Sequence, residues 1–450
     1  MNCAALASSA ARLRKLVCCA GFAALTAGLA FNVNVSAAPT ALAACVATLT
    51  PGGIEVGARG AAGLSFAVAI APGCAYNVVS NSPFIVVTSA SSGVGSGSIS
   101  FMVQPNSGPT RRGSIAVAGL NFTVKQAKRT SVAATPFDFD GDGKSDIGVY
   151  RPGSGTWFVL QSLAGSTTSV QFGFGADKLV PADYDGDGKA DVAIYRPSSG
   201  TWYALGTTSG FTATQFGFST DIPAPADYDG DGKADIAIYR PSNGTWYILG
   251  TSRGFYAVQW GFSTDLPVPA DYDGDGKTDI AVYRPSSGTW YILRSRDGFI
   301  ATPWGFGTDI PIAADFDGDG KADLGLYRPS TGTWYLLQSS AGFKSMQFGF
   351  STDMPMAADY DGDGKADIAI YRPSSGTWYV QASRDGFSVT PWGNGADIPI
   401  AADFDGDGKA DFTIYRPSNG TWYTLASSAG LSVTQFGVGT DIPIVGAPRR

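Results

Sequence analysis

A nine-residue motif, Asp-x-Asp-Gly-Asp-Gly-Lys-x-Asp, recurs seven times in this chain of 450 residues. Its copies are separated by 45 residues once and then by 44 residues five times, and they begin at Asp138, Asp183, Asp227, Asp271, Asp315, Asp359 and Asp403. A fixed period of this length is typical of propellers and solenoids, in which each repeat packs against its neighbours. The repeat therefore restricts the C-terminal two thirds of the chain to very few architectures.

One period contains four strand candidates separated by short turns, shown by the third repeat at 222–226, 235–239, 245–249 and 255–260. Three short connections predict an up-and-down meander, which is the form of one propeller blade. Seven periods predict seven blades, and a β-solenoid is disfavoured because its coils are usually much shorter. Two segments could supply the strand that closes the ring: the end of the chain from Asp441, or the residues just before Asp138.

Each motif places carboxylates at its positions 1, 3, 5 and 9 and a lysine carbonyl at position 7. Calcium takes six to eight oxygen ligands in a flexible geometry, and this spacing wraps such ligands around one point. An EF-hand is rejected because position 12 is never glutamate and falls in an expected strand. The alternative, a plain Asp-Gly turn without metal, leaves four repelling carboxylates with one lysine nearby. We therefore predict about seven Ca²⁺ ions, with these ligands (each lysine through its carbonyl): Asp138, Asp140, Asp142, Lys144, Asp146, Asp183, Asp185, Asp187, Lys189, Asp191, Asp227, Asp229, Asp231, Lys233, Asp235, Asp271, Asp273, Asp275, Lys277, Asp279, Asp315, Asp317, Asp319, Lys321, Asp323, Asp359, Asp361, Asp363, Lys365, Asp367, Asp403, Asp405, Asp407, Lys409 and Asp411.

The acidic residues outside these loops bear on catalysis. The chain has no histidine, and Glu55 is its single glutamate. The most common general base and every triad that uses it are therefore missing. A catalytic residue normally occurs once, and only Asp297 and Asp385, both in Arg-Asp-Gly turns, lie outside a repeated set. We predict no catalytic residue and no enzyme, with a calcium-dependent polysaccharide lyase or hydrolase as the alternative.

Three more residue types recur once per period. Their matched numbers predict an Arg–Asp ion pair across blades, with ligand contact by the arginines as the alternative, and inter-blade packing of the tryptophans. Trp260, Trp304 and Trp392 replace phenylalanine in the fourth strand and are better ligand candidates because they vary. The recurring sets are Arg151, Arg196, Arg240, Arg284, Arg328, Arg372 and Arg416; Asp177, Asp221, Asp265, Asp309, Asp353, Asp397 and Asp441; and Trp157, Trp202, Trp246, Trp290, Trp334, Trp378 and Trp422.

The N-terminus reads as an export signal. Basic residues from Arg12 to Lys15 precede an apolar run over 16–31, and small-residue cleavage sites follow, so we expect residues 1–44 to be a signal peptide and leader. No transmembrane segment is expected in the mature chain. Only Cys45 and Cys74 then remain, which predicts one disulfide in an oxidising compartment, with lipidation of Cys45 as the alternative.

Residues 45–126 contain no aspartate and alternate in short apolar runs broken by Gly, Ser, Asn and Pro, which predicts a small β-sandwich. A linker over 127–134 joins it to the propeller, which we expect over 135–447. The whole fold is thus predicted to be all-β.

Two parts of the chain resemble known families. Residues 45–126 resemble the BACON module, which implies an immunoglobulin-like sandwich; Tyr76 stands where a tryptophan is expected, so sugar stacking there is not implied. The repeats, in which the Asp motif is followed by stretches such as Ile-Ala-Ile-Tyr-Arg-Pro (236–241) and Gly-Thr-Trp-Tyr (244–247), resemble the FG-GAP (VCBS-type) repeats of bacterial surface proteins and the integrin α-subunit propeller. That resemblance implies calcium-binding loops. The first resemblance is carried by Cys45, 73–76, 80–85, 92–97, Asn106, 111–113 and 119–126.

These features together predict a secreted or cell-surface calcium-binding propeller that recognises an extracellular carbohydrate or surface protein. No nucleic-acid partner is expected, and the oligomeric state is left open. A structural spacer without a ligand is the third possibility.

Overall fold

The computed structural model describes residues 45–56, 61–104, 111–126 and 136–444. The predicted leader 1–44 and the predicted linker 127–134 lie outside these residues. The regular elements of the described ranges are strands, and no described helix has the length and apolarity needed to cross a membrane. The all-β prediction is confirmed.

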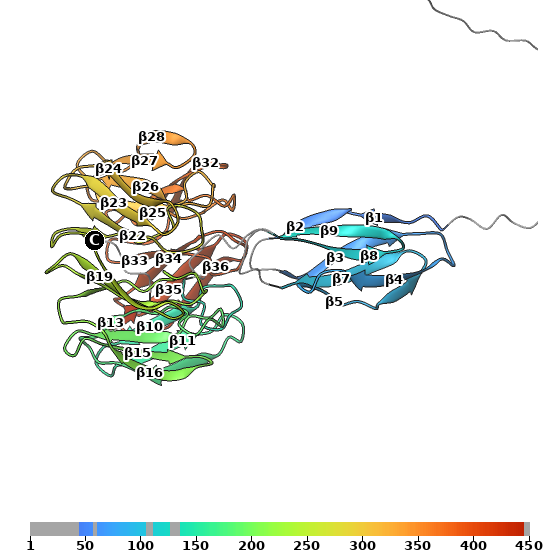
Figure 1. Ribbon diagram of the computed structural model, residues 1–450, viewed down its shortest axis with the longest axis horizontal. Coiled ribbons are helices and arrows are strands. Elements are labelled where there is room, and N and C mark those ends of the chain that lie inside the picture. The colour runs from blue at the N-terminus through green and yellow to red at the C-terminus, as the bar shows by residue number, and fades with distance from the viewer. Residues whose placement is uncertain (1–44, 57–60, 105–110, 127–135, 445–450) are drawn as a thin grey trace, which may run out of the picture. The chain divides into compact units, whose positions relative to one another are not determined.

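Two sheets share one apolar core in the N-terminal part (Figure 1). Phe66 and Phe122 stack at the centre of this core with their ring centroids 4.1 Å apart. Cys45 and Cys74 are both disulfide-bonded, as the sequence predicts. One sheet has the order β1 (Thr48–Thr50), β3 (Ala61–Ala69), β7 (Gly97–Val103), β5 (Ile85–Val87), and the other β2 (Gly53–Val56), β9 (Leu120–Gln126), β8 (Arg111–Val117), β4 (Ala75–Ser80), β6 (Ser92–Val94).

The repeats form four-stranded antiparallel sheets, one for each period. The first sheet contains β10 (Ile147–Arg151), β11 (Thr156–Leu160), β12 (Thr167–Gln171) and, from the end of the chain, β37 (Ile442–Pro443). The six others follow the order of the sequence: β13 (Lys178–Leu179), β14 (Val192–Arg196), β15 (Thr201–Gly206), β16 (Gly210–Gln215); β17 (Ile222–Pro223), β18 (Ile236–Arg240), β19 (Thr245–Gly250), β20 (Gly254–Gln259); β21 (Leu266–Pro267), β22 (Ile280–Arg284), β23 (Thr289–Arg294), β24 (Gly298–Pro303); β25 (Ile310–Ala314), β26 (Asp323–Arg328), β27 (Thr333–Gln338), β28 (Gly342–Gln347); β29 (Met354–Pro355), β30 (Ile368–Arg372), β31 (Thr377–Ala382), β32 (Gly386–Pro391); β33 (Ile398–Ala402), β34 (Asp411–Arg416), β35 (Thr421–Ala426), β36 (Gly430–Gln435).

Burial along each sheet explains its residue types. The second strand is apolar at successive positions because both of its faces are covered, as in β22 and β30. The fourth strand is mostly exposed and mixes polar residues with an exposed apolar one, as β16 does with Phe211. Six of the seven first strands begin with an apolar residue followed by proline, whereas β13 begins with Lys178 and Leu179. Proline suits an edge strand because it donates no ladder hydrogen bond. Burial within each sheet is therefore highest in the second strand and lowest in the fourth, outer strand.

Neighbouring sheets pack through the recurring tryptophans, which are all at most 2% exposed. Trp246 in β19 lies in one cluster with Ile280 and Val282 of the next sheet. The last sheet packs on the first in the same way, because Val149 of β10 clusters with Tyr415 and Trp422. The predicted inter-blade packing of the tryptophans is confirmed.

The end of the chain, and not the segment before Asp138, completes the first sheet. Tyr150 of β10 pairs with Ile442, and the amide of Ile444 donates to the carbonyl of Gly148 at 2.8 Å. The side chain of Ile444 is 1% exposed and packs against Tyr150, whereas Ile442 is 47% exposed. The two isoleucines of the tail thus have opposite environments.

We expect Ile444→Ala to lower the free energy of unfolding by about 2 to 5 kcal/mol, because it leaves a cavity in a closed core. Ile442→Ala, two residues earlier on an exposed face, should change it by less than about 1 kcal/mol. Chemical denaturation of both variants measures the difference. Equal effects would show that the tail does not seal the first sheet.

Candidate functional site

Each Asp motif folds into a tight loop held by its own carboxylates. In the second loop Asp183 accepts hydrogen bonds from the amides of Gly186 and Gly188 at 2.6 and 2.9 Å. Asp191 accepts one from the amide of Tyr184 at 2.8 Å. Gly186 and Gly188 have φ angles of 80° and 90°, a region that favours glycine. The glycines of the motif therefore turn the chain so that positions 1 and 9 face the loop interior.

The aspartate at position 3 reaches the turn between the third and fourth strands of its own sheet. One oxygen of Asp185 accepts from the amides of Thr208 and Ser209 at 2.8 and 2.9 Å. Its other oxygen, Oδ1, is buried and has no hydrogen-bond partner, and the same holds for Asp229 and Asp273. Asp273 is only 1% exposed. An unpartnered buried carboxylate oxygen is costly unless a cation or a donor meets it.

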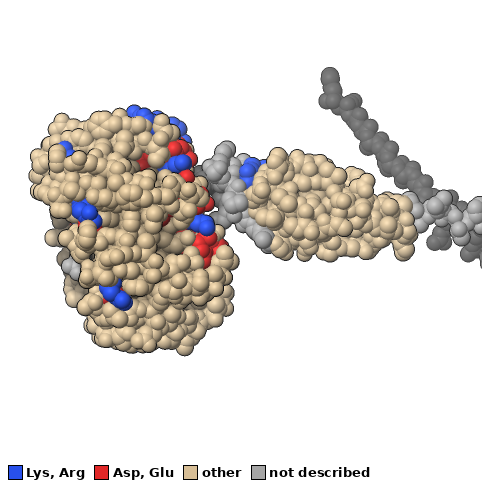
Figure 2. All heavy atoms as spheres, turned by 90° about the horizontal axis from the view of Figure 1, so that it is seen from below, with Lys and Arg blue, Asp and Glu red and all other residues tan. Residues whose placement is uncertain are grey.

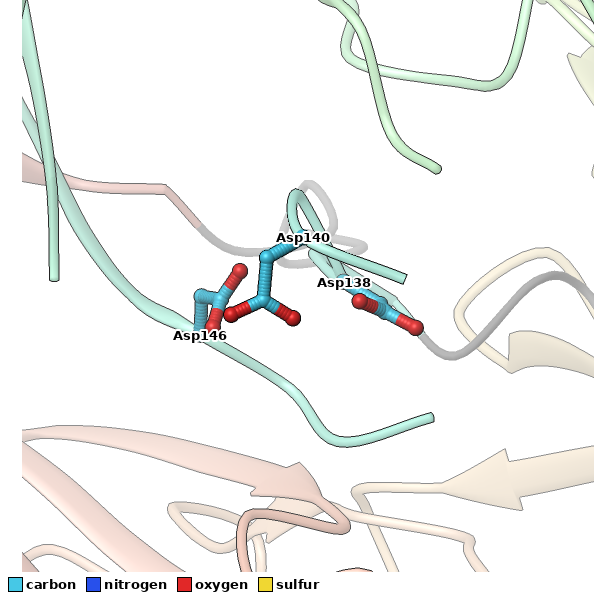
Figure 3. A group of neighbouring side chains, drawn as sticks. All are labelled: Asp138, Asp140 and Asp146. Atoms are coloured by element: carbon cyan, nitrogen blue, oxygen red, sulfur yellow. The ribbon is translucent and has the colours of Figure 1, made fainter. Parts of the chain in front are cut away.

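The carboxylates at positions 1, 3 and 9 converge. Figure 3 shows Asp138, Asp140 and Asp146 with their carboxylates near one another; each contributes one oxygen, and these oxygens lie within 4.8 Å of each other. The first five loops repeat this triad, and two further acidic groups bring the total among the described residues to seven. The oxygen-only donor set is the kind that a hard cation prefers. These clusters could hold a metal ion.

The predicted ligands at positions 5 and 7 are placed differently. In the second loop Asp187, at position 5, accepts from the amide of Lys189 at 3.0 Å and from the hydroxyl of Thr207. It is not part of the triad formed by positions 1, 3 and 9. The lysine side chain at position 7 extends over the preceding loop: a Cβ added to Gly186 would lie 3.0 Å from side-chain carbons of Lys233.

Burial sets the proton affinity of the triads. It raises the pKa of the position 9 aspartates to about 6, as for Asp191 and Asp235, and that of Asp279 to about 7. Burial also raises the pKa of Asp183 at position 1. At Asp185 burial acts in the same direction, but hydrogen bonds from Ser209 and Thr208 outweigh it and the pKa is lowered. A cation among the three carboxylates would stabilise their charged forms.

Adjacent loops are joined by a hydrogen bond that the sequence does not predict. The amide of Ala190, at position 8, donates to the carbonyl of Asp138 at 2.6 Å. The amide of Ser145 closes the circle by donating to Asp403 at 2.7 Å. The signal was the small residue at every position 8. The seven donors are Ser145, Ala190, Ala234, Thr278, Ala322, Ala366 and Ala410, and the acceptors are Asp403, Asp138, Asp183, Asp227, Asp271, Asp315 and Asp359.

A family model described as FG-GAP-like repeat matches residues 138–194, 183–238, 227–282, 271–326, 315–370 and 359–414. The matches together span 138–414, more than half of the chain. The chain belongs to the FG-GAP-like repeat family. Each matched segment begins at the first aspartate of one of the Asp loops described above.

A comparison with curated proteins found no match to this FG-GAP-like chain. Among solved structures, it is similar to an Agrocybe aegerita lectin described as recognising non-reducing terminal N-acetylglucosamine, at 17% identity and a TM-score of 0.49, covering 69% of this chain and 92% of that one. A virginiamycin B lyase from Staphylococcus aureus has 8% identity and a TM-score of 0.42, covering 59% and 86%. A streptogramin B lyase has 10% identity and a TM-score of 0.43, covering 66% and 95%. None of the three is similar enough to assign a function.

The recurring arginines and aspartates do pair. Arg240 donates to Asp221 through Nε at 3.0 Å and Nη2 at 2.8 Å, and the other repeats have the same two-bond pair. The partners lie within one sheet: Asp221 precedes β17 and Arg240 ends β18. The prediction that the Arg–Asp pair crosses between blades is therefore wrong. Sequence spacing could not locate the pair, because Asp221 lies between the fourth strand of one sheet and the first strand of the next.

The varying tryptophans lie partly buried between neighbouring sheets, and ligand contact by them stays a prediction. Trp260 and Trp392 donate from Nε1 to the carbonyls of Tyr291 and Tyr423 in the next sheet, at 3.1 and 3.2 Å. Trp304 packs partly buried in an inter-sheet cluster. Their larger rings fill space between sheets.

Asp273→Asn should separate metal binding from loop folding. The amide oxygen of the new residue can accept from Arg296 and Asp297, as one carboxylate oxygen does now at 2.9 and 3.0 Å, and its NH₂ group would replace the unpartnered Oδ1. In chelator the melting temperature should stay the same or rise, because one repelling charge is gone. With a divalent cation, the metal-induced rise should be smaller than in the natural chain.

Asp385→Asn is the matched control, because it removes the same charge at an exposed site outside the triads. Calorimetry of both variants with and without metal gives the comparison. A full metal-induced rise in Asp273→Asn would mean that position 3 binds no cation.

Proposed function

We propose that this chain is a secreted or cell-surface protein whose seven-bladed propeller binds calcium in its loops and an extracellular ligand on its surface, without chemical turnover. The ligand is a carbohydrate or a surface protein, and residues 45–126 form an immunoglobulin-like BACON module in front. The observation that carries the proposal is the repeated triad of buried and partly buried carboxylates, in which the Oδ1 atoms of Asp185, Asp229 and Asp273 have no hydrogen-bond partner.

Calcium fits these loops better than magnesium does. Calcium accepts six to eight oxygens in flexible geometry, whereas magnesium favours a strict octahedron with retained water. In the second loop the triad is Asp183, Asp185 and Asp191, and we assign the position 5 carboxylate of Asp187 and the carbonyl of Lys189 as the remaining protein ligands. Extracellular calcium modules bind at about 10⁻⁴ to 10⁻³ M, which suits a protein that works outside the cell.

Export is supported by the disulfide-bonded Cys45 and Cys74, since disulfides persist in oxidising compartments. FG-GAP-like repeats are also typical of extracellular proteins. Both observations agree with the apolar leader in the sequence.

Binding without turnover is favoured by the acidic residues outside the repeated sets. Asp297 pairs with Arg296 at 2.9 Å, and Asp385 pairs with Arg384 at 2.8 Å. The adjacent arginine lowers the pKa of each aspartate, so neither is suited to act as a general acid near neutral pH. Near-identical sheets instead present similar surfaces several times, which lets weak contacts add through multivalency.

The proposed calcium binding can be tested through the metal content of the protein. The folded chain should bind about seven calcium ions, and chelation should lower its melting temperature markedly, because ions that bind only the folded state stabilise it by mass action. Elemental analysis after dialysis in calcium and thermal unfolding with and without EDTA are the measurements. An unchanged melting temperature in EDTA would contradict the calcium role.

The second prediction concerns turnover. Incubated with a panel of polysaccharides and extracellular proteins, the chain should be retained on its ligand and release no new chain ends. Retention is measured by pull-down and cleavage by a reducing-end assay. New chain ends that disappear in Asp297→Asn or Asp385→Asn would establish the enzyme alternative instead.

A further inference from the structure

Two cavities open between neighbouring sheets at equivalent positions of the repeat. We call them the Phe218 groove, with a volume of about 250 Å³, and the Phe350 groove, with a volume of about 330 Å³. The first is lined by Gln215, Phe216, Gly217, Phe218, Ile238, Arg240 and Tyr247, and the second by the corresponding residues three repeats later and by Phe387. Each groove therefore combines aromatic rings, one side-chain amide and one guanidinium.

Large aromatic side chains stand exposed along these grooves. Phe218 is 62% exposed, Phe350 61% and Phe387 60%. Charged atoms are sparse over the face of the repeat region seen in Figure 2. Exposed phenylalanine is unfavourable in water, and its clustering marks a binding surface. Equivalent positions in other repeats carry further exposed rings: Phe174, Phe211, Phe255, Phe262, Phe299, Phe306 and Phe343.

The charge in each groove is already neutralised. The guanidinium of Arg240 is bound to Asp221, which is 0% exposed, and lies 4.1 Å from the ring centroid of Phe218 and 4.3 Å from that of Tyr247. A ligand anion would have to compete with Asp221 for the guanidinium. The paired arginine also fixes both rings before any ligand arrives, which reduces the entropy lost on binding. The groove is thus electrically neutral, with both rings held against the guanidinium.

We propose that the Phe218 and Phe350 grooves are binding sites for neutral saccharide units. The apolar C–H face of a sugar ring packs on the exposed phenylalanine, and a hydroxyl bonds the amide of Gln215 or Gln347. This inference rests on the proposed ligand-binding function and names its site and ligand class. A protein partner is less suited, because a stable protein interface buries roughly 800 Å² on each side and these cavities are small and separate.

The contact between the sixth sheet (β29–β32) and the seventh (β33–β36), called the sixth position, provides a natural comparison. It keeps the arginine pair, with Arg416 bound to Asp397 at 2.8 Å. Pro391, Asn394 and Leu431 occupy the positions of Gln215, Phe218 and Phe255, so both exposed rings are missing, and the side-chain amide of Asn394 already accepts from the amide of Ala396 at 3.2 Å. The same backbone frame should therefore bind no saccharide there.

The test uses the full exported chain in calcium. An array of neutral and anionic oligosaccharides first selects the ligand, and titration calorimetry then counts sites in the natural chain and in the double variant Phe218→Ala/Phe350→Ala. We expect the double variant to lose two saccharide sites per chain. Leu431→Ala, in the sixth position and 64% exposed, is the matched control and should keep every site. Phe218→Trp/Phe350→Trp should restore binding, because a flat ring is retained.

Several results would overturn this inference. They are an unchanged number of sites in the double variant, selection of anionic saccharides alone, and no retained saccharide. Capture of an extracellular protein with no saccharide bound would overturn the ligand class and leave the proposed binding function intact. Release of new chain ends would instead contradict binding without turnover.

Discussion

Crowding of like charges in the Asp loops is the constraint on which the repeat region depends. Four carboxylates within nine residues repel one another, and the structure directs each of them to different amides or to the shared centre. Asp183 holds the turn, Asp185 ties it to the outer turn of the same sheet, and Asp191 binds the amide of Tyr184. A backbone carbonyl of each loop then accepts a hydrogen bond from the next loop, as the carbonyl of Asp138 does from the amide of Ala190. One motif thus shapes the turn, joins two strands of a sheet and links adjacent sheets.

The sequence was informative wherever a feature recurred at every period. The strand order followed from the four strand candidates and the short turns within one period. The burial of Trp246 followed from its recurrence, because a position that is equivalent in every repeat has the same neighbours in every repeat. The disulfide-bonded state of Cys45 and Cys74 followed from their number and expected compartment. The triad at positions 1, 3 and 9 was contained in the predicted ligand set.

Features that depend on contact between repeats could not be derived from one period. Asp221 lies between two sheets in the sequence, so only the fold shows that it pairs within the sheet of Arg240. The sequence did not show that position 8 donates a hydrogen bond between loops, because the donor is the backbone amide of a small residue. The exposure of Phe218 was missed because an aromatic residue in a strand-rich repeat is usually a core residue. The grooves follow from that exposure.

Closure of the first sheet by the tail has a consequence for the order of assembly. Arg151 and Asp441 are paired across 290 residues of sequence. Each of the six later sheets is formed by one continuous segment, so it can assemble as soon as that segment has emerged from the ribosome or the export channel. The first segment of the repeat region must instead wait, with β10 unpaired on one edge, until synthesis reaches Ile442. Until then its free edge presents unpaired backbone groups that can pair with another chain.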